Sequence, residues 1–293
     1  MTSAPIRNAM TVDVEDWFQV QAFAGNIDRS GWDGLESRVA ANTEAVLALF
    51  DAADVRATFF TLGWVAERQP ALIRAIVAAG HELASHGHGH ERVHEMGEAR
   101  FRADIRRAKA VLENAGGVAV RGYRAPTFSI GPATPWAHRV LAEEGHGYSS
   151  STFPIKHDLY GAADAPRVPH RPDAHGVMEL PMTTLRRFGR NLPCSGGGFF
   201  RLLPYGLFRA GLTRVNAEGT PGIFYFHPWE IDPGQPRVAA GMRSRLRHYT
   251  GLASMAPRLA RLLRDFTWGR LDDVHAAALG QAAPPAGVQM AAE

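Results

Sequence analysis

Short apolar runs alternate with helical patterns through the first half of the chain. The runs are rich in β-branched and aromatic residues, and each is followed by apolar residues at helical spacing. The predicted strands are 9–14, 57–62, 82–86 and 118–123, and the predicted helices are 39–50, 70–80, 101–116 and 136–144. This alternation is typical of βα units, which form a parallel sheet or barrel with helices outside. We therefore predict an α/β fold with its functional residues at the carboxyl ends of the strands.

The composition is that of an ordinary globular protein, since 45% of the 293 residues are hydrophobic and 21% are charged. The single cysteine, Cys194, excludes a disulfide within the chain and a thiolate zinc cluster. No apolar run reaches the length of a membrane span, and residues 1–10 lack the apolar stretch of a secretory signal. We expect a cytoplasmic protein, with peripheral membrane association left open.

The second half is less regular. We predict a long loop over 154–172, strands over 177–182 and 222–227, and a flexible turn over 194–198. A basic helix is predicted over 243–264 and a disordered tail over 280–293. Residues 186–270 contain 14 arginines against four acidic residues. We interpret this excess as solvated helix faces, and binding to an anionic glycan or a membrane surface is left open. Nucleic-acid binding is not expected, because no recognition motif accompanies the charge.

Three carboxylates follow the first predicted strand. Asp13 and Glu15 would share a face by strand alternation, and Asp16 would lie at the turn. Carboxylates this close repel one another unless a cation or a proton relieves the charge. The cluster therefore predicts a metal site, or a raised pKa for one of these carboxyl groups.

Five of the 13 histidines lie within residues 81–94. His86, His88 and His90 come directly after the predicted strand 82–86, and a helical turn would direct His86 and His90 to the same side. Two imidazoles and a carboxylate are a common three-ligand metal set that leaves room for water.

Two further polar groups end predicted strands. Arg124 stands beside Pro126 and could pair with a carboxylate and hold it ionised. His227 follows the strand 222–227, and an imidazole is suited to proton transfer near neutral pH.

In their order along the chain, these motifs resemble those of the polysaccharide deacetylase family (carbohydrate esterase 4, or NodB homology). Residues 80–90, GHELASHGHGH, resemble the family's zinc-binding segment, and Arg124-Ala125-Pro126 and residues 223–227 resemble two further motifs. The resemblance covers residues 11–232 and implies a distorted (β/α) barrel. Within the family, the segments TVDVEDWF and HPWEID look like the subfamily found beside exosortase and exopolysaccharide genes.

The resemblance implies roles for individual residues. Asp13 would be the general base, with Arg124 orienting it, and His227 would be the general acid. His86 and His90 would hold a divalent metal ion, for which zinc is the first expectation. The backbone near Thr127 would help to stabilise the oxyanion.

Two points stay open in this comparison. Strand alternation favours Glu15 as the third metal ligand, whereas the aspartate at the family's metal position favours Asp16. Related sequences often carry an acid where this chain has Ser149, so the sequence identifies no partner for His227.

The implied function is removal of N-acetyl groups from an amino-sugar polysaccharide or its lipid-linked precursor, in exopolysaccharide biosynthesis. Candidates for the sugar-binding wall are Trp17, Phe18, Phe128 and Trp229. The alternatives are hydrolysis of a small cyclic amide, as in the allantoinase-like branch, and a glycan-binding module with a relict site. We predict a deacetylase domain over residues 1–235, a basic helical extension over 236–280 and a tail over 281–293. The oligomeric state is left open.

Overall fold

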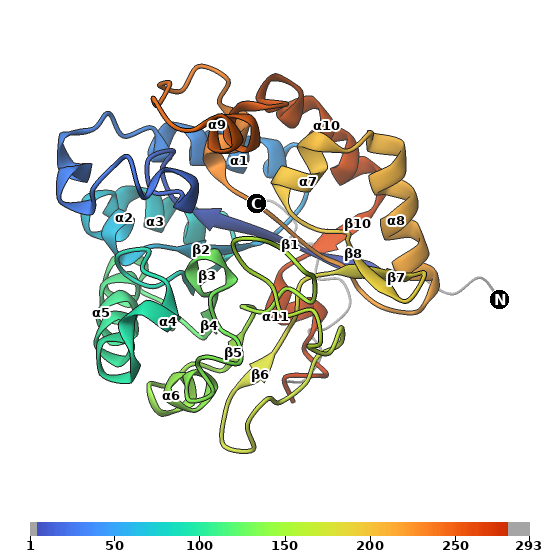
Figure 1. Ribbon diagram of the computed structural model, residues 1–293, viewed down its shortest axis with the longest axis horizontal. Coiled ribbons are helices and arrows are strands. Elements are labelled where there is room, and N and C mark those ends of the chain that lie inside the picture. Colours follow the sequence, from blue (N-terminus) through green and yellow to red (C-terminus); the bar gives the residue numbers. More distant parts are fainter. Residues whose placement is uncertain (1–4, 281–293) are drawn as a thin grey trace, which may run out of the picture.

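A curled sheet of eight parallel strands forms the centre of the molecule in the computed structural model, which describes residues 5–280 (Figure 1). Six neighbouring strands run in the order β1-β2-β3-β4-β5-β6, and β9 and β10 both pair with β1. The strands are β1 (Arg7–Val14), β2 (Thr58–Thr61), β3 (Glu82–Ser85), β4 (Gly122–Tyr123), β5 (Tyr148–Ser149), β6 (Met178–Glu179), β9 (Ile223–Phe226) and β10 (Thr267–Gly269). The predicted α/β class and distorted barrel are confirmed.

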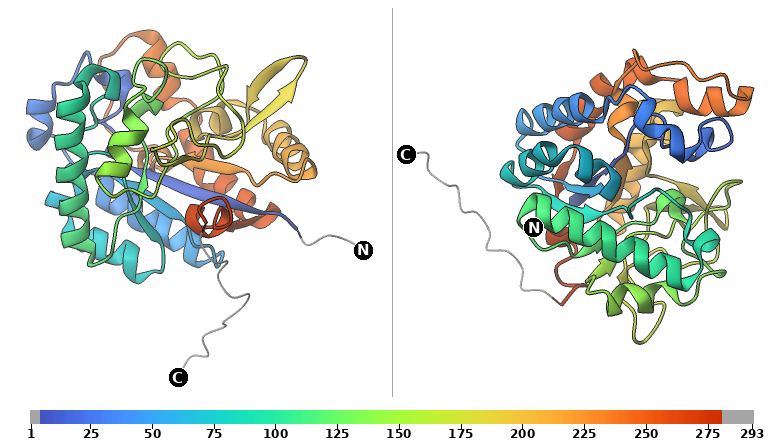
Figure 2. Two further views of the ribbon diagram at one scale, coloured as in Figure 1. Left: turned by 90° about the horizontal axis from the view of Figure 1, so that it is seen from below. Right: turned by 90° about the vertical axis from the view of Figure 1, so that its left-hand side faces the viewer.

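Helices surround the sheet, as the two side views in Figure 2 show. They are α1 (Val39–Asp51), α2 (Gly63–Arg68), α3 (Pro70–Ala78), α4 (Val93–Met96), α5 (Glu98–Gly116), α6 (Ala137–Glu143), α7 (Gly197–Leu202), α8 (Tyr205–Ala217), α9 (Met242–Tyr249), α10 (Leu252–Asp265) and α11 (Leu271–Val274). No helix among residues 5–280 is long and apolar enough to cross a membrane.

Strand alternation separates the apolar core from the polar interior of the sheet. Val12 and Val14 of β1 pack in the main core, together with residues of α1 and α10. Thr11 and Asp13 alternate with these valines along β1 and point to the opposite face, where both contact the buried side chain of Arg124. The period of two in β1 thus places the acidic side chains inside the curl of the sheet.

The structure differs from the sequence-based boundaries in several places. The predicted strand 118–123 pairs over two residues as β4, and the predicted turn 194–198 runs into α7. A short antiparallel hairpin, β7 (Thr184–Arg187) and β8 (Arg190–Pro193), was not predicted, and neither was helix α2.

The predicted basic helix 243–264 is two helices, α9 and α10. Gly251 separates them with a left-handed backbone (φ 78°), a conformation that glycine adopts without steric cost. The division of the chain at residue 235 stays a prediction, and β10 of the C-terminal segment pairs with β1. The predicted tail beyond residue 280 lies outside the described residues.

Candidate active site

The carboxyl ends of β1, β3, β4 and β9 meet at one edge of the sheet and surround a cavity. Each of the four sequence motifs contributes at least one residue to this region. The cavity is lined by Asp13, Glu15, His86, His90, His227 and Trp229, among others. The structure therefore brings together residues that lie more than 200 positions apart in the chain.

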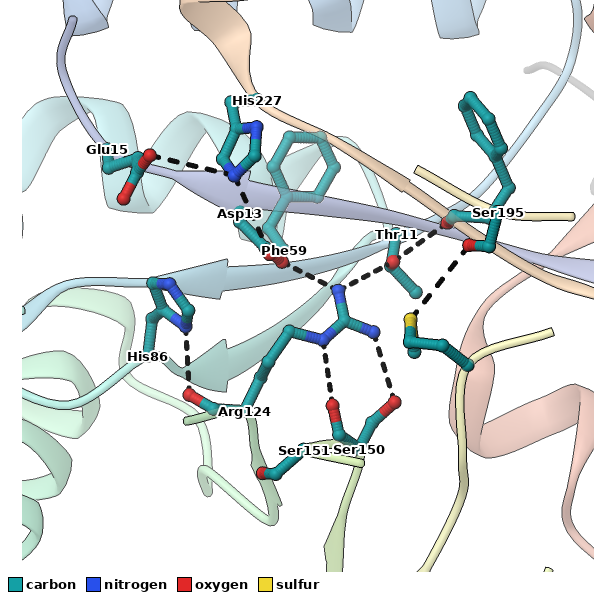
Figure 3. A network of polar contacts seen from close by, with 12 residues as sticks. Thr11, Asp13, Glu15, Phe59, His86, Arg124, Ser150, Ser151, Ser195 and His227 are labelled. Atoms are coloured by element: carbon teal, nitrogen blue, oxygen red, sulfur yellow. Dashed lines mark hydrogen bonds and ion pairs between the residues drawn. The ribbon is translucent and has the colours of Figure 1, made fainter. Parts of the chain in front are cut away.

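A buried ion pair joins Asp13 to Arg124 (Figure 3). Arg124 Nη1 lies 2.6 Å from Asp13 Oδ1 and 2.8 Å from Thr11 Oγ1. Its Nε and Nη2 donate to the backbone carbonyl and the hydroxyl of Ser150 at 3.0 and 3.1 Å, and the guanidinium lies 4.0 Å from the centre of the Phe60 ring. Arg124 is thus held from several sides, and its fixed charge orients the Asp13 carboxylate.

Glu15, His86 and His90 form a buried group whose ligand atoms all lie within 4.8 Å of one another. His90 Nε2 lies 2.7 Å from Glu15 Oε2. His86 Nδ1 lies 2.8 Å from the backbone carbonyl of Arg124, and a proton donated there leaves Nε2 facing the group. His90 has a left-handed backbone (φ 52°), an uncommon conformation for a residue other than glycine.

The electrostatics of this group suit a divalent cation. Burial lowers the pKa of His86 to about 4, so its imidazole is neutral at pH 7, which is the form that binds metals. Burial alone would raise the pKa of Glu15, but the imidazoles of His90 and His227 lower it to about 2. Glu15 Oε2 is buried, and its polar neighbour is His90 Nε2, another atom of the same group. Two imidazoles and one buried carboxylate fit a zinc-type ion with an open coordination position.

Asp16 lies outside this group, although the sequence left it open as a ligand. Its Oδ2 accepts hydrogen bonds from Ser37 Oγ and from the backbone N–H groups of Arg38 and Val39, at 2.7, 2.9 and 3.1 Å. Its Oδ1 accepts the N–H of Trp17 at 2.9 Å. The Asp16 carboxylate therefore fixes the loop before α1, while Glu15 faces the histidines.

The turn that carries the histidines is held by Asp104 of α5. The Asp104 carboxylate accepts the backbone N–H groups of His88 and Gly89 at 2.9 and 3.3 Å. A side chain on Gly87 would come within 2.9 Å of Asp104 Oδ2, and Gly87 has a φ of 75°. Sequence reasoning did not find Asp104, because nothing in the pattern of α5 distinguishes it from a solvated helix residue.

His227 stands opposite the Asp13 and Glu15 carboxylates. Its Nε2 lies 3.6 Å from Glu15 Oε1 and 4.0 Å from Asp13 Oδ2. Its Nδ1 lies 3.0 Å from Glu230 Oε2. Burial disfavours the charged ring, but the negative charges of Glu15 and Glu230 outweigh this cost and raise the pKa of His227 to about 9.

Sequence reasoning missed Glu230 and its buried partner Arg201, whose Nε lies 2.8 Å from Glu230 Oε1. Glu230 follows His227 by three residues across Pro228, the spacing of a capping box, and this signal could have been used. Arg201 lies 29 residues before Glu230 in the chain and carries no local signal.

Two of the four candidates for the sugar-binding wall, Phe128 and Trp229, line the cavity. Thr127 lines it as well, and Thr127 and Phe128 have left-handed backbones (φ 56° and 47°). The prediction was wrong for Trp17 and Phe18, because both are buried away from the cavity. The indole N–H of Trp17 donates to the backbone carbonyl of Glu36, and its ring meets Phe18 edge to face in an aromatic cluster.

Two family models match parts of the chain. Residues 31–143 match the model described as polysaccharide deacetylase, and residues 150–276 match a domain of unknown function (DUF3473). A peptidoglycan-N-acetylglucosamine deacetylase from Bacillus cereus is 32% identical over 73 residues, which are 25% of this chain and 26% of the relative. The matched segment thus spans about a quarter or less of the curated relatives.

Solved structures share the fold. A Mycobacterium smegmatis protein described as a candidate polysaccharide deacetylase has a TM-score of 0.63 at 20% identity, covering 100% of this chain and 99% of that one. The PuuE allantoinase has a TM-score of 0.60 at 19% identity, covering 94% and 92%. The resemblance to the polysaccharide deacetylase family is therefore supported by the family model and, at the level of the fold, by these structures.

Proposed function

We propose that this chain is a metal-dependent hydrolase that removes N-acetyl groups from an amino-sugar polysaccharide or its lipid-linked precursor. One observation carries the proposal: a carboxylate held by a buried arginine, a metal-type ligand group and a histidine opposite them all line one cavity. The relatives whose names specify deacetylation support the substrate class.

Glu15, His86 and His90 would hold the metal ion. A divalent ion there supplies polarisation of the acetyl carbonyl and a lowered pKa for a bound water. Zinc is proposed because the ligands are imidazole and carboxylate, and the single cysteine, Cys194, is buried apart from them.

The side chains of this protein divide the remaining chemistry between them. Asp13, oriented by Arg124, accepts the proton of the attacking water. Thr127 lies on the cavity wall, where its backbone N–H is placed to stabilise the oxyanion, whereas the N–H of Phe128 donates to the Ala125 carbonyl at 3.1 Å. His227 protonates the leaving sugar amine.

The biological setting proposed is exopolysaccharide biosynthesis. It rests on the resemblance of residues 11–18 and 227–232 to the subfamily found beside exosortase and exopolysaccharide genes. The match of residues 150–276 to DUF3473 is compatible with this setting.

The test is acetate release from β-1,4-linked N-acetylglucosamine oligomers. We expect release by the metal-loaded protein, loss after chelation, recovery on adding zinc, and loss in Asp13→Asn. Allantoin serves as the small cyclic amide for comparison. Hydrolysis of allantoin without acetate release, or full activity of Asp13→Asn, would overturn the proposal.

A further inference from the structure

Glu230 lies beside Nδ1 of the His227 ring, whereas Asp13 and Glu15 lie on the side of Nε2. It lies on the 3-10 turn η4 (Pro228–Ile231), and its Oε2 accepts the backbone N–H of His227 at 2.9 Å and faces the ring Nδ1 at 3.0 Å. One carboxylate oxygen therefore fixes both the backbone and the ring of the same residue. Because Nδ1–H points to Glu230, Nε2 must point toward Asp13 and Glu15.

Arg201 of α7 holds Glu230 in turn. Its Nε binds Glu230 Oε1 at 2.8 Å, and both side chains are 1% exposed. The other guanidinium nitrogens donate to backbone carbonyls at the end of α9 and just after it: Arg247 at 3.0 Å, His248 at 3.2 Å, and Thr250. Arg201 therefore balances the charge of Glu230 and leaves Oε2 free for His227.

The surroundings leave little room for another arrangement. A Cβ atom on Gly197 would come within 2.1 Å of Glu230 Oε2. The His227 ring stacks on Trp229 with centroids 5.1 Å apart, and Trp229 stacks on His248 at 4.2 Å. The orientation of the imidazole is thus set by a carboxylate on one edge and by an indole on one face.

These residues all belong to the part of the chain that matches the domain of unknown function. Arg201, His227 and Glu230 lie within residues 150–276, whereas Asp13 and the metal-type group lie before residue 150. We infer that the DUF3473 region supplies the proton-donating half of the site, with Glu230 and Arg201 as positioning residues for His227. The inference rests on the proposed function for the identity of the leaving group.

In the step concerned, the C–N bond of the tetrahedral intermediate breaks and its electron pair goes to nitrogen. That nitrogen takes the proton from His227 Nε2, and acetate and a free amine are released. Glu230 retains its hydrogen bond to Nδ1–H throughout, so the ring presents Nε2 to the leaving group without reorienting.

The experiment compares two leaving groups. An N-acetylglucosamine oligomer must expel an amine, which needs a proton, whereas 4-nitrophenyl acetate expels a phenolate, which does not. We expect Glu230→Gln to lower kcat for the oligomer by roughly 100-fold with KM little changed, and to lower ester hydrolysis by less than about threefold. The matched control is Asp232→Asn, which breaks a carboxylate–arginine pair at the end of the same turn, to Arg38 at 2.5 Å, without touching His227. The control should leave the ratio of the two activities unchanged.

An equal fall on both substrates, or no fall on either, would overturn the inference. A second measurement is independent of turnover: ¹⁵N NMR of the histidine rings in metal-free protein, with the His227 signals assigned from His227→Gln. We expect a hydrogen-bonded Nδ1–H that is lost in Glu230→Ala, and an unchanged signal would also overturn the inference. If the wild-type protein released no acetate, the proposed function would fail, and the NMR result would still decide whether Glu230 positions His227.

Discussion

Replacing Asp16 with asparagine separates its structural role from metal binding. The carboxylate accepts four hydrogen bonds, three on Oδ2 and one on Oδ1. An asparagine that keeps its oxygen at the Oδ2 position retains three of them. Its amide group then faces the N–H of Trp17, so one buried donor loses its acceptor.

The size of the effect follows from two opposing terms. A buried donor without a partner costs about 1–3 kcal/mol. Burial raises the pKa of Asp16, so the neutral asparagine avoids part of the cost of placing a charge there. We expect a net loss of about 1–2 kcal/mol in the free energy of unfolding and a fall of a few degrees in Tm.

The assay is thermal unfolding of the wild type, Asp16→Asn and Glu15→Gln, each with chelator and with zinc, together with calorimetric metal binding. Asp16→Asn should lower Tm in both conditions and keep the zinc-dependent increase. Glu15→Gln should lose at least about 100-fold in zinc affinity, which removes about 2.7 kcal/mol of metal-dependent stabilisation. If Asp16→Asn abolished the zinc-dependent increase and Glu15→Gln kept it, our reading of the site would be refuted.

Two further predictions concern a glycine and a histidine outside the metal-type group. Gly197→Ala should reduce kcat for N-acetylated oligomers far more than for 4-nitrophenyl acetate, because the added Cβ would meet Glu230 Oε2. The control Gly206→Ala should leave both rates unchanged, because no atom lies within 4 Å of the Cβ that it adds. Burial lowers the pKa of His146 to about 3, whereas the pKa of this histidine in the unfolded chain is 6.5. The neutral His146 side chain therefore contributes fully to the free energy of unfolding above pH 6.5, and this contribution is lost as the pH falls toward 3. Urea unfolding should show the wild type losing about 3 kcal/mol more than His146→Phe between pH 7.5 and about 4.5, and parallel stability curves would contradict this.

The sequence predicted the fold well where the hydrophobic period was regular. The four early strands and the helices α1, α3, α5 and α6 lie where the pattern indicated. The break between α9 and α10 was missed because both sides of Gly251 continue a basic, helical pattern. A glycine in the left-handed region is set by how the two helices pack, and the local composition does not reveal it.

At the candidate site, the local sequence pattern predicted which residues belong to the site better than it predicted which side chains contact one another. Strand alternation favoured Glu15 over Asp16, and Glu15 is the side chain that lies beside the histidines. Arg201 was not found because its role depends on a contact with Glu230 that only the tertiary fold creates. Trp17 was misplaced because an aromatic residue beside an acidic motif has the same sequence pattern whether it packs in the core or lines a cavity.

The position of β1 between β2 and β9 has a consequence for how this protein folds. β1 carries Asp13 and pairs with β9, although the paired residues, such as Ala9 and Ile223, are roughly 210 positions apart. Contacts of such long range form late, since the entropy of closing the intervening chain must be overcome first. During synthesis, one edge of β1 would stay unpaired until β9 has left the ribosome. Acquisition of a complete site is therefore expected to be among the last events of folding, and a chain truncated before residue 222 should lack it altogether.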